Sequence, residues 1–334
     1  RREARRKENR LAGQQVRLPK IHRKLRSGTM KNAIVYRIPE FWPTSVEALS
    51  MVLHTRRFVG CSPTDAESSG WVYPAKHSAG LAHQVGRHIV ITLQTETKIL
   101  PASVVNRYVS EKVESVEREE GRRVGRKERS EIAETLRLAL LRKAFSKIDR
   151  TTAYLDTKAS RMVVDTSSAK RADDLACKLL EIGGITIRKF MTTERPELAM
   201  RRWLSGDVPD AITIDDECEL VGKGDDRPTV KYQRHSLDGE DVREHLSCGK
   251  MPTRAAITYI DRASFVLTDD LHIKRFALVD TMPAARGDSP TEEERFDADV
   301  ALYASEMAGV LGWIEDALGG PAEEKPTTTT GAGE

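Results

Sequence analysis

Apolar residues recur at helical spacing in two adjacent stretches of the first half of the chain. After Pro101 they fall at three- and four-residue steps, at Val104, Val105, Tyr108, Val109, Val113 and Val116. A second stripe begins near Ser130 and contains Ile132, Leu136, Ala139 and Leu140. Gly121 and a basic run separate the two stripes. Since proline suits the first helical turn and each stripe covers one helix face, the pattern predicts a helical hairpin with a basic tip.

Short apolar runs and further periodic stretches lie on both sides of this hairpin. Strands are predicted near residues 33–38, 87–94, 152–156, 162–165, 185–190, 211–220, 229–234, 255–259, 264–267 and 273–279. Helices are predicted over 43–54, from a cap at Ser167 or Ser168 to 183, and over 196–206, 239–247 and 291–318. Residues 70–74 are predicted as loop, with Trp71 packed against a sheet. The alternation predicts an α+β fold with mixed sheets, packed helices and the protruding hairpin.

The composition changes along the chain and suggests its division into regions. Residues 1–29 carry 11 Lys/Arg and 2 Asp/Glu without apolar periodicity, so we expect a basic disordered extension. It is either an arm that grips nucleic acid or sequence upstream of a true start at Met30, and we favour the second. We expect a central α+β region from 30–100 with 146–200, the hairpin at 101–145, a second α+β region with a C-terminal helix at 201–320, and a disordered tail at 321–334.

The net charge of +3 conceals an acidic body, because the residues after 29 hold 43 Lys/Arg and 49 Asp/Glu. A polyanion can therefore be bound only where positive charge is segregated. Between Arg107 and Arg150 there are 13 basic and 9 acidic residues, with the acidic ones mostly before the tip. The candidate phosphate contacts are Arg122, Arg123, Arg126, Lys127, Lys143, Lys147, Lys231, Arg234 and Lys250. For each of them, a solvated surface role is the alternative.

Motifs of enzymes, cofactor sites and sequence-reading DNA-binding folds do not occur in the sequence. The four cysteines form no Cys-x-x-Cys pair, so neither a zinc site nor a disulfide framework is predicted, and a reducing, cytoplasmic compartment is the default. A phosphate loop, a helix-turn-helix, a zinc finger and a membrane-spanning stretch are not found either. We therefore expect no enzymatic activity, no cofactor and no membrane partner, and favour non-specific contacts with the nucleic-acid backbone.

Two pairs of carboxylates leave a metal-dependent nuclease as an alternative. Asp156 and Asp165 end neighbouring predicted strands, and Asp297 and Asp299 lie close in sequence. Residues two apart on a helix point to different faces, however, and His83 with His88 is not a metal-ligand spacing on a strand. We therefore interpret these carboxylates as caps and surface charges and expect no metal site.

An ordered set of short segments resembles the recombination-associated RdgC family across about residues 30–320. The segments are MKNAIVYR (30–37), GWV (70–72), KILP (98–101), RKAFSK (142–147), VDTSSAK (164–170), GK (249–250), RFDAD (295–299) and ALGG (317–320). The resemblance implies a non-enzymatic, nucleoid-associated protein whose curved subunits form a ring-shaped homodimer around double-stranded DNA, with single-stranded DNA as a further candidate ligand. It also implies that the ring restrains RecA-dependent homologous recombination and replication-fork repair.

The resemblance also implies a role for Phe145. It places Phe145 where two subunits meet, whereas the residues alone allow either a core position or an exposed anchor. The chain departs from the family pattern at Arg142-Lys143, where Pro-Arg is usual, and at His235, where a neutral polar residue is usual.

The other alternative function is that of an interaction protein without its own DNA site. Such a protein would bind a recombinase through the acidic C-terminal helix.

Overall fold

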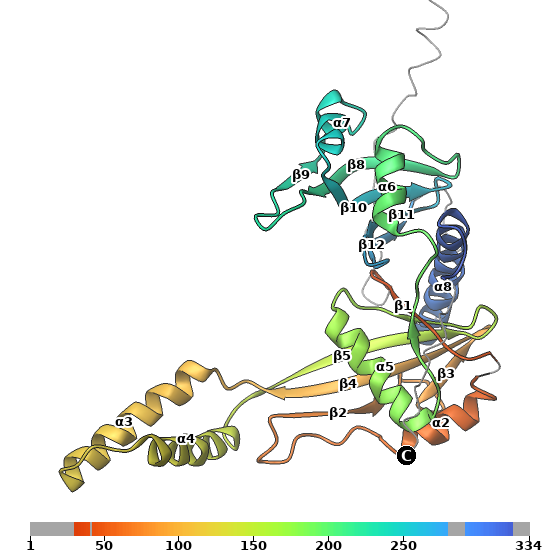
Figure 1. Cartoon of the computed structure of the whole chain (residues 1–334). Helices are drawn as coiled ribbons and strands as arrows, with labels where there is room; N and C mark the ends of the chain where they lie inside the picture. Colours follow the sequence, from red (N-terminus) through yellow and green to blue (C-terminus); the bar gives the residue numbers. More distant parts are fainter. Residues whose placement is uncertain (1–29, 41, 280–290, 323–334) are drawn as a thin grey trace, which may run out of the picture.

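The computed structural model describes residues 30–40, 42–279 and 291–322. The predicted N-terminal extension lies outside the described residues, as does the predicted tail beyond residue 322. Within the described part, seven helices accompany two sheets whose strands all pair antiparallel. The predicted α+β class is thereby confirmed, and Figure 1 shows the two sheets one above the other.

The first sheet is built mainly from the first half of the chain. Its strands run in the order β2 (Glu67–Val72), β4 (His88–Lys98), β5 (Ser146–Asp156), β6 (Arg161–Val164), β1 (Ile34–Arg37) and β7 (Arg188–Lys189), and β3 (Ala82–Val85) pairs with β4. Helices α2 (Val46–His54) and α5 (Ala169–Gly183) pack on one face. Ser45 caps α2 by accepting a hydrogen bond from the Ala48 N–H, and Ser168 caps α5 in the same way from Arg171.

Both faces of the first sheet are buried, which explains why its central strands are continuous apolar runs. Successive strand residues point to opposite faces. Val35 and Val90 therefore belong to the core that reaches the second sheet. Their neighbours Ile34 and Ile91 belong to the core beneath α2 and α5.

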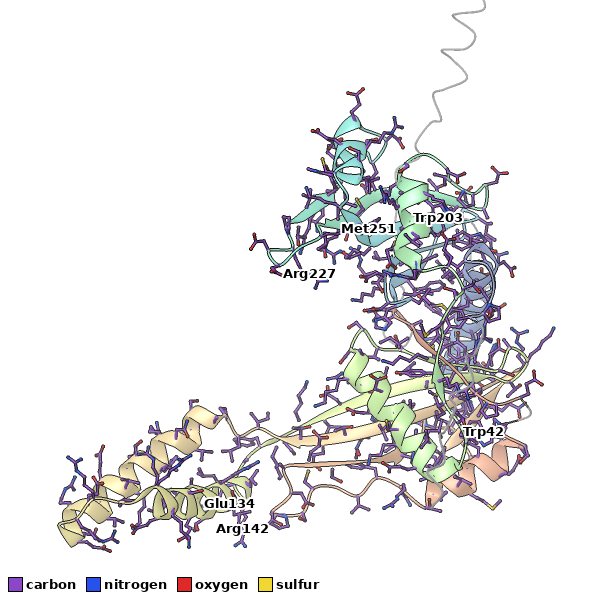
Figure 2. The ribbon with its side chains drawn as sticks, viewed as in Figure 1. Trp42, Glu134, Arg142, Trp203, Arg227 and Met251 are labelled. Carbon is purple, nitrogen blue, oxygen red and sulfur yellow. The ribbon has the colours of Figure 1, made fainter. Side chains whose placement is uncertain are left out.

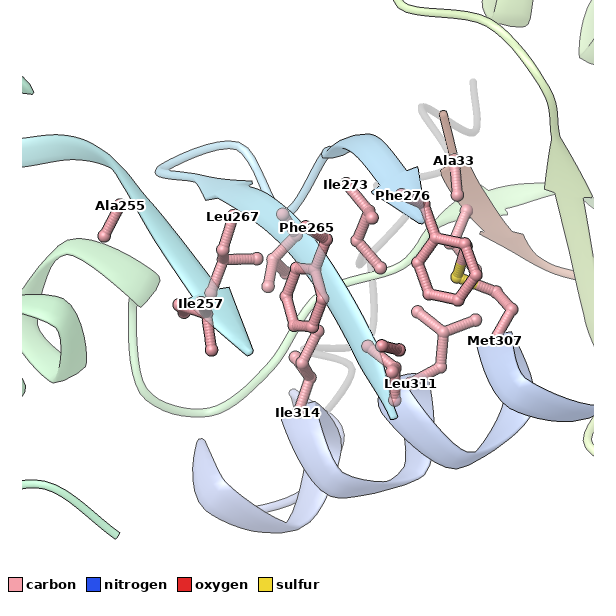
Figure 3. Close-up of a cluster of buried hydrophobic side chains, with 14 of the residues drawn as sticks. Ala33, Ala255, Ile257, Phe265, Leu267, Ile273, Phe276, Met307, Leu311 and Ile314 are labelled. Carbon is pink, nitrogen blue, oxygen red and sulfur yellow. The ribbon is translucent and has the colours of Figure 1, made fainter. Parts of the chain in front are cut away.

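The second sheet carries the strand order β12 (Ile273–Leu278), β11 (Ala263–Thr268), β10 (Met251–Tyr259), β8 (Ile212–Val221) and β9 (Thr229–Gln233). Helix α6 (Pro196–Leu204) packs against β10, α7 (Glu240–Ser247) follows β9, and α8 (Glu292–Ala317) closes the described fold. Figure 3 shows Met307, Leu311 and Ile314 of α8 facing the side chains of the sheet. None of the described helices, α8 included, is both long and apolar enough to cross a membrane.

The two sheets share one core and are joined directly by backbone hydrogen bonds. The Ala33 N–H donates to Ile273 O at 2.8 Å, and the Ile273 N–H donates back to Ala33 O at 2.9 Å. The chain then enters β1 one residue later, so a single extended segment belongs to both sheets. Helix α8 adds a second connection, because Glu315 forms ion pairs with both Arg37 of β1 and Arg161 of β6.

Helices α3 (Ala102–Glu120) and α4 (Arg126–Leu141) lie outside both sheets. They contact one another and are inserted between β4 and β5, which pair over their full lengths from His88–Asp156 to Lys98–Ser146. We call residues 101–145 the helical arm. In Figure 1 the arm extends to the lower left, and β9 with α7 extends to the upper left. The subunit is therefore curved, and these two parts project to the same side.

Several strand predictions need correction: β3 was not predicted, and β4 continues to Lys98 rather than ending near 94. Residues 67–72 form strand β2 rather than loop, although Trp71 is buried against the sheet as expected. Gly70 permits this strand because a Cβ there would lie 2.4 Å from Phe58 Cα. Strand β5 begins at Ser146 rather than near 152, since its polar first half is held by pairing with β4. Strand β7 is shorter than predicted and covers only Arg188–Lys189.

Candidate nucleic-acid interface

The turn at the end of the helical arm is ordered by its own charged side chains. Gly121 ends α3 in the left-handed conformation, and its N–H donates to Glu117 O. Arg122 donates two hydrogen bonds of 2.7 Å to the Glu128 carboxylate and lies 2.6 Å from Glu120. These hydrogen bonds hold the pKa of Glu128 below its usual value. Arg122, the first predicted phosphate contact, is therefore neutralised by two carboxylates and organises the turn.

Arg123, Arg126 and Lys127 at the same tip are exposed and have no carboxylate partner within the described residues. Arg126 and Lys127 open α4, and the N-cap residue before them, Gly125, provides no side-chain cap. The unpaired N–H groups of a helix N-terminus carry partial positive charge, so cations placed there repel the helix end and attract an anion. We call these three residues the tip cations. They give the arm a local excess of positive charge.

The root of the arm is the second place where the structure gathers predicted residues. Lys147 Nζ lies 2.9 Å from Asp149, and Arg171 also pairs with that carboxylate at 3.0 Å. The two cations hold the pKa of Asp149 below its usual value. Lys143 is exposed and has no carboxylate partner within the described part of the chain. Lys147 is therefore already paired, whereas Lys143 is available.

Phe145 lies between these two lysines and is not part of the core. This residue is 86% exposed, the highest value among the exposed large apolar residues of the described structure. The Ile99 N–H donates to Phe145 O at 2.7 Å, so Ile99, which is also exposed, lies next to it on the facing chain. The structure thus excludes packing within its own subunit and leaves an apolar patch at the root of the arm.

The remaining candidates lie at the β9 edge of the second sheet. Lys231 faces Glu219 across the β8–β9 pair and forms an ion pair of 3.2 Å with it, and Arg254 pairs with the same carboxylate at 2.9 Å. Lys250 Nζ lies 2.9 Å from His245 Nδ1. Arg234 follows β9 in the left-handed conformation, is exposed and has no carboxylate partner among the described residues. Of these three cations, Arg234 therefore has neither a carboxylate partner nor a histidine contact among the described residues.

Two exposed arginines that are not among the predicted phosphate contacts lie beside these groups. Arg227 lies in the turn between β8 and β9, and Arg142 ends α4. Figure 2 shows Arg227 at the far end of the β8–β9 strand pair and Arg142 on the helical arm. Arg227 follows two acidic residues, Asp225 and Asp226, so the sequence does not mark it as part of a basic cluster. Arg142 precedes Lys143, which is the predicted contact at this position. The predicted residues thus form three separate groups on the two projecting parts of the chain.

Asp156 and Asp165, the first pair of carboxylates considered for a nuclease, do not come together. Asp156 ends β5 and Asp165 follows β6, and because the two strands are antiparallel, these residues lie at opposite ends of the strand pair. Asp165 accepts hydrogen bonds from the Lys31 and Asn32 N–H groups, and burial raises its pKa. Asp156 accepts from the N–H groups of Lys158 and Ala159. Both carboxylates therefore satisfy backbone donors.

A different set of residues in the described part has the composition of a metal site. His77, His83 and Asp297 place one ligand atom each within 4.8 Å of one another. The sequence pattern at His83 and His88 gives no sign of this group, because Asp297 lies 214 residues away from His83. No short-range spacing could have revealed it.

Comparison with known proteins agrees with the resemblance. The family model described as "Putative exonuclease, RdgC" matches residues 29–321. The chain is 38% identical to the recombination-associated protein RdgC of Cupriavidus pinatubonensis, over 87% of this chain and 98% of that protein. It is 36% identical to the protein of the same name from Janthinobacterium sp. (strain Marseille), over 88% and 99%, and 34% identical to that of Bordetella pertussis, over 87% and 98%. The chain therefore belongs to the RdgC family of recombination-associated proteins.

Proposed function

We propose that this protein binds the backbone of double-stranded DNA without sequence preference and acts as a non-enzymatic, nucleoid-associated factor in the cytoplasm. Its role is to restrain RecA-dependent recombination and fork repair by occupying DNA. Single-stranded DNA is a secondary ligand. The family membership supports the link with recombination, and the distribution of charge supports the mode of binding.

One observation carries the proposal: both projecting parts of the chain carry exposed cations without carboxylate partners among the described residues, although the residues after 29 are net acidic. The tip cations Arg123, Arg126 and Lys127 and the root residue Lys143 lie on the helical arm. Cations nearer the core, such as Arg37 and Arg161, share Glu315. A cation that already has a carboxylate gains little from a phosphate, whereas a solvated one releases the counterions of the phosphate it neutralises. The arm is therefore the part of the chain best suited to contact DNA.

The exposed apolar patch at the root supports a homodimer. Phe145 and Ile99 are both exposed, although a large aromatic side chain gains most when it is desolvated in a contact. The subunit is curved, and the helical arm and the β9–α7 region project to the same side. This shape suits a ring in which each subunit supplies half of the wall. The free cations of the arm would then line the space through which DNA passes.

Duplexes of the same length and unrelated sequence test the binding mode. We expect their dissociation constants to agree within a few-fold at any one salt concentration, because phosphate contacts carry no sequence information. A chain that begins at Met30 is the control for the basic segment 1–29 and should keep this behaviour. Preference for one sequence by several kcal/mol would contradict the proposal.

Phe145→Ser and Lys143→Ala test the ring separately from the phosphate contacts. We expect Phe145→Ser to keep its fold, because its side chain packs on no core, and to remain a dimer while leaving circular DNA faster than wild type. Lys143→Ala should weaken binding to linear and circular DNA alike. A large fall in Tm for Phe145→Ser without a selective effect on circular DNA would remove the support for a ring.

The two alternative functions appear as outcomes of the same assays. Metal-dependent cleavage of DNA that is lost on Asp165→Ala would establish a nuclease, although the two hydrogen bonds to Asp165 favour a structural role. Recombinase inhibition that persists without DNA binding would establish an interaction protein. We expect neither, because inhibition by DNA occupancy should fall in parallel with DNA affinity.

A further inference from the structure

We infer that His77, His83 and Asp297 form a binding site for one divalent transition-metal ion of the zinc class, which fastens α8 to the first sheet. The site goes beyond DNA binding and does not depend on it. Its three residues come from the loop before β3, from β3 itself and from α8. It therefore joins segments that are more than 200 residues apart in the chain.

The ligand atoms converge at distances that suit a small metal ion. His77 Nε2 lies 3.2 Å and His83 Nε2 lies 2.9 Å from the same oxygen, Asp297 Oδ1. A tetrahedral zinc ion with bonds of about 2.0–2.1 Å holds adjacent ligand atoms roughly 3.3 Å apart. Both rings thus present the same nitrogen to one point, and because all three ligand atoms lie within 4.8 Å of one another, side-chain movements that draw them together would admit an ion.

Each of the two histidines is held by its own supporting structure. A tight turn precedes His83 and orients His77, since the Ala75 N–H donates to Ser78 Oγ and the Ser78 N–H donates to Ala75 O. His83 is fixed opposite Val90 in the β3–β4 pair. The two rings pack edge to face, with centroids 4.8 Å apart. Such support lowers the cost of bringing three ligands together before the ion arrives.

The sides of the site differ in their access to solvent. The side chains of His77 and His83 are 15% and 13% exposed, whereas that of Asp297 is 42% exposed. Phe296 lies against both rings, with centroids 5.8 Å and 6.1 Å away. The imidazoles are therefore covered by protein, and the carboxylate side leaves space for water as a fourth ligand.

The donor set selects the ion. Two imidazoles and one carboxylate suit Zn²⁺ and its neighbours in the first transition row, whereas Mg²⁺ and Ca²⁺ require mainly oxygen ligands. The site lies at β3 and α8, on the side of the first sheet away from the helical arm. Because α8 also packs on the second sheet, an ion here would hold the two sheets in a fixed relation. Two histidines that only hydrogen-bond to Asp297 are the metal-free alternative.

Zinc binding by the full chain, without an affinity tag and after removal of bound metal, tests the site. We expect competition with a chromophoric chelator to give one high-affinity Zn²⁺ per chain. His77→Gln and His83→Gln should each weaken that affinity at least about 100-fold, since both remove a direct ligand. His54→Gln, at an exposed histidine of α2, is the matched control and should bind as wild type does.

Cobalt and thermal unfolding separate the metal site from a hydrogen-bonded clamp. Bound Co²⁺ should give the intense visible absorption of a four-coordinate site, and Zn²⁺ should raise the Tm of wild type and of His54→Gln but not of the histidine variants. A weak six-coordinate spectrum, absence of stoichiometric Zn²⁺, or equal affinity in wild type and the double variant His77→Gln/His83→Gln would overturn the inference. The wild-type cobalt spectrum decides the question even where a variant fails to fold.

Discussion

Helices α3 and α8 are both long, yet they use their side chains in opposite ways. Helix α8 buries seven residues, and its Glu315 neutralises Arg37 and Arg161 of the first sheet. Helix α3 buries only Val109 and Val113, and the turn that follows it leads to cations without carboxylate partners in the described structure. Charge near α8 therefore stabilises the fold, whereas the tip cations of the helical arm remain free for a ligand.

A pair of leucine truncations gives the largest expected contrast between the two regions. Leu311 of α8 is 2% exposed and Leu138 of α4 is 38% exposed. We expect Leu311→Ala to lower the free energy of unfolding by about 2–5 kcal/mol, because it leaves a cavity between α8 and the second sheet. Leu138→Ala should cost less than about 1 kcal/mol. Urea denaturation measures both, and equal losses would mean that the arm is packed as tightly as the core.

Removal of the charge on Glu315 tests whether this carboxylate stabilises the fold by compensating the charges of Arg37 and Arg161. Arg161 is 9% exposed and Arg37 is 34% exposed, so Glu315→Gln leaves one arginine buried without a counter-charge. We expect a loss of roughly 3 kcal/mol in the free energy of unfolding, at the lower end of the range for broken buried pairs. The exposed Glu293→Gln on the same helix is the control and should change stability by less than about 0.5 kcal/mol. A loss below about 1 kcal/mol for Glu315→Gln would show that Arg161 finds other compensation.

The pH dependence of stability should depend on Asp156 in the first sheet. Burial raises the pKa of this carboxyl, but His88, the Ala159 N–H and Arg87 outweigh it and lower the pKa to about 2. A depressed folded-state pKa stabilises the fold above the unfolded value and loses that contribution as pH falls through the folded value. The stabilisation at neutral pH is about 2 kcal/mol, lost between about pH 4 and pH 2.

Urea denaturation across this acid range checks the assignment. Wild type should lose stability more steeply than Asp156→Asn, which has no carboxyl to titrate at this position. Asp261→Asn, at an exposed turn residue in the left-handed conformation, should retain the wild-type profile. Parallel profiles for wild type and Asp156→Asn would show that other carboxylates cause the acid sensitivity.

The smallest effect on stability is expected for the tip cations. The triple variant Arg123→Gln/Arg126→Gln/Lys127→Gln should unfold within about 0.5 kcal/mol of wild type, because it breaks no ion pair and relieves repulsion at the N-terminus of α4. Thermal unfolding is sufficient to measure this. A clear loss of stability would mean that these cations hold the arm together instead of being free for DNA.

Sequence reasoning recovered most elements because their signals are local. The caps at Ser45 and Ser168 and the periodicity of α8 determine helices without reference to the rest of the chain. The first half of β5 was missed because its polar residues form a strand only by pairing with β4. Strand β2 was missed because serine and glycine are typical of loops, whereas Gly70 here permits close contact with Phe58.

The candidate site was only partly predictable for the same reason. Lysines and arginines can be counted in a sequence, but their partners depend on the fold. Lys231 is neutralised by Glu219 through strand register, and Lys147 by Asp149 in β5. The His77–His83–Asp297 group is formed by segments that only tertiary structure brings together.

The salt dependence of duplex DNA affinity tests the central claim most directly. It should be measured for wild type, for the tip triple variant and for a matched triple variant, Lys178→Gln/Lys189→Gln/Arg202→Gln, whose cations are ion-paired. We expect a steep linear fall of log K with log salt for wild type, and a slope reduced by up to roughly 0.9 for each phosphate contact removed in the tip variant. The matched variant should keep the wild-type slope. Equal slopes for the two triple variants, or a wild-type slope near zero, would contradict the account.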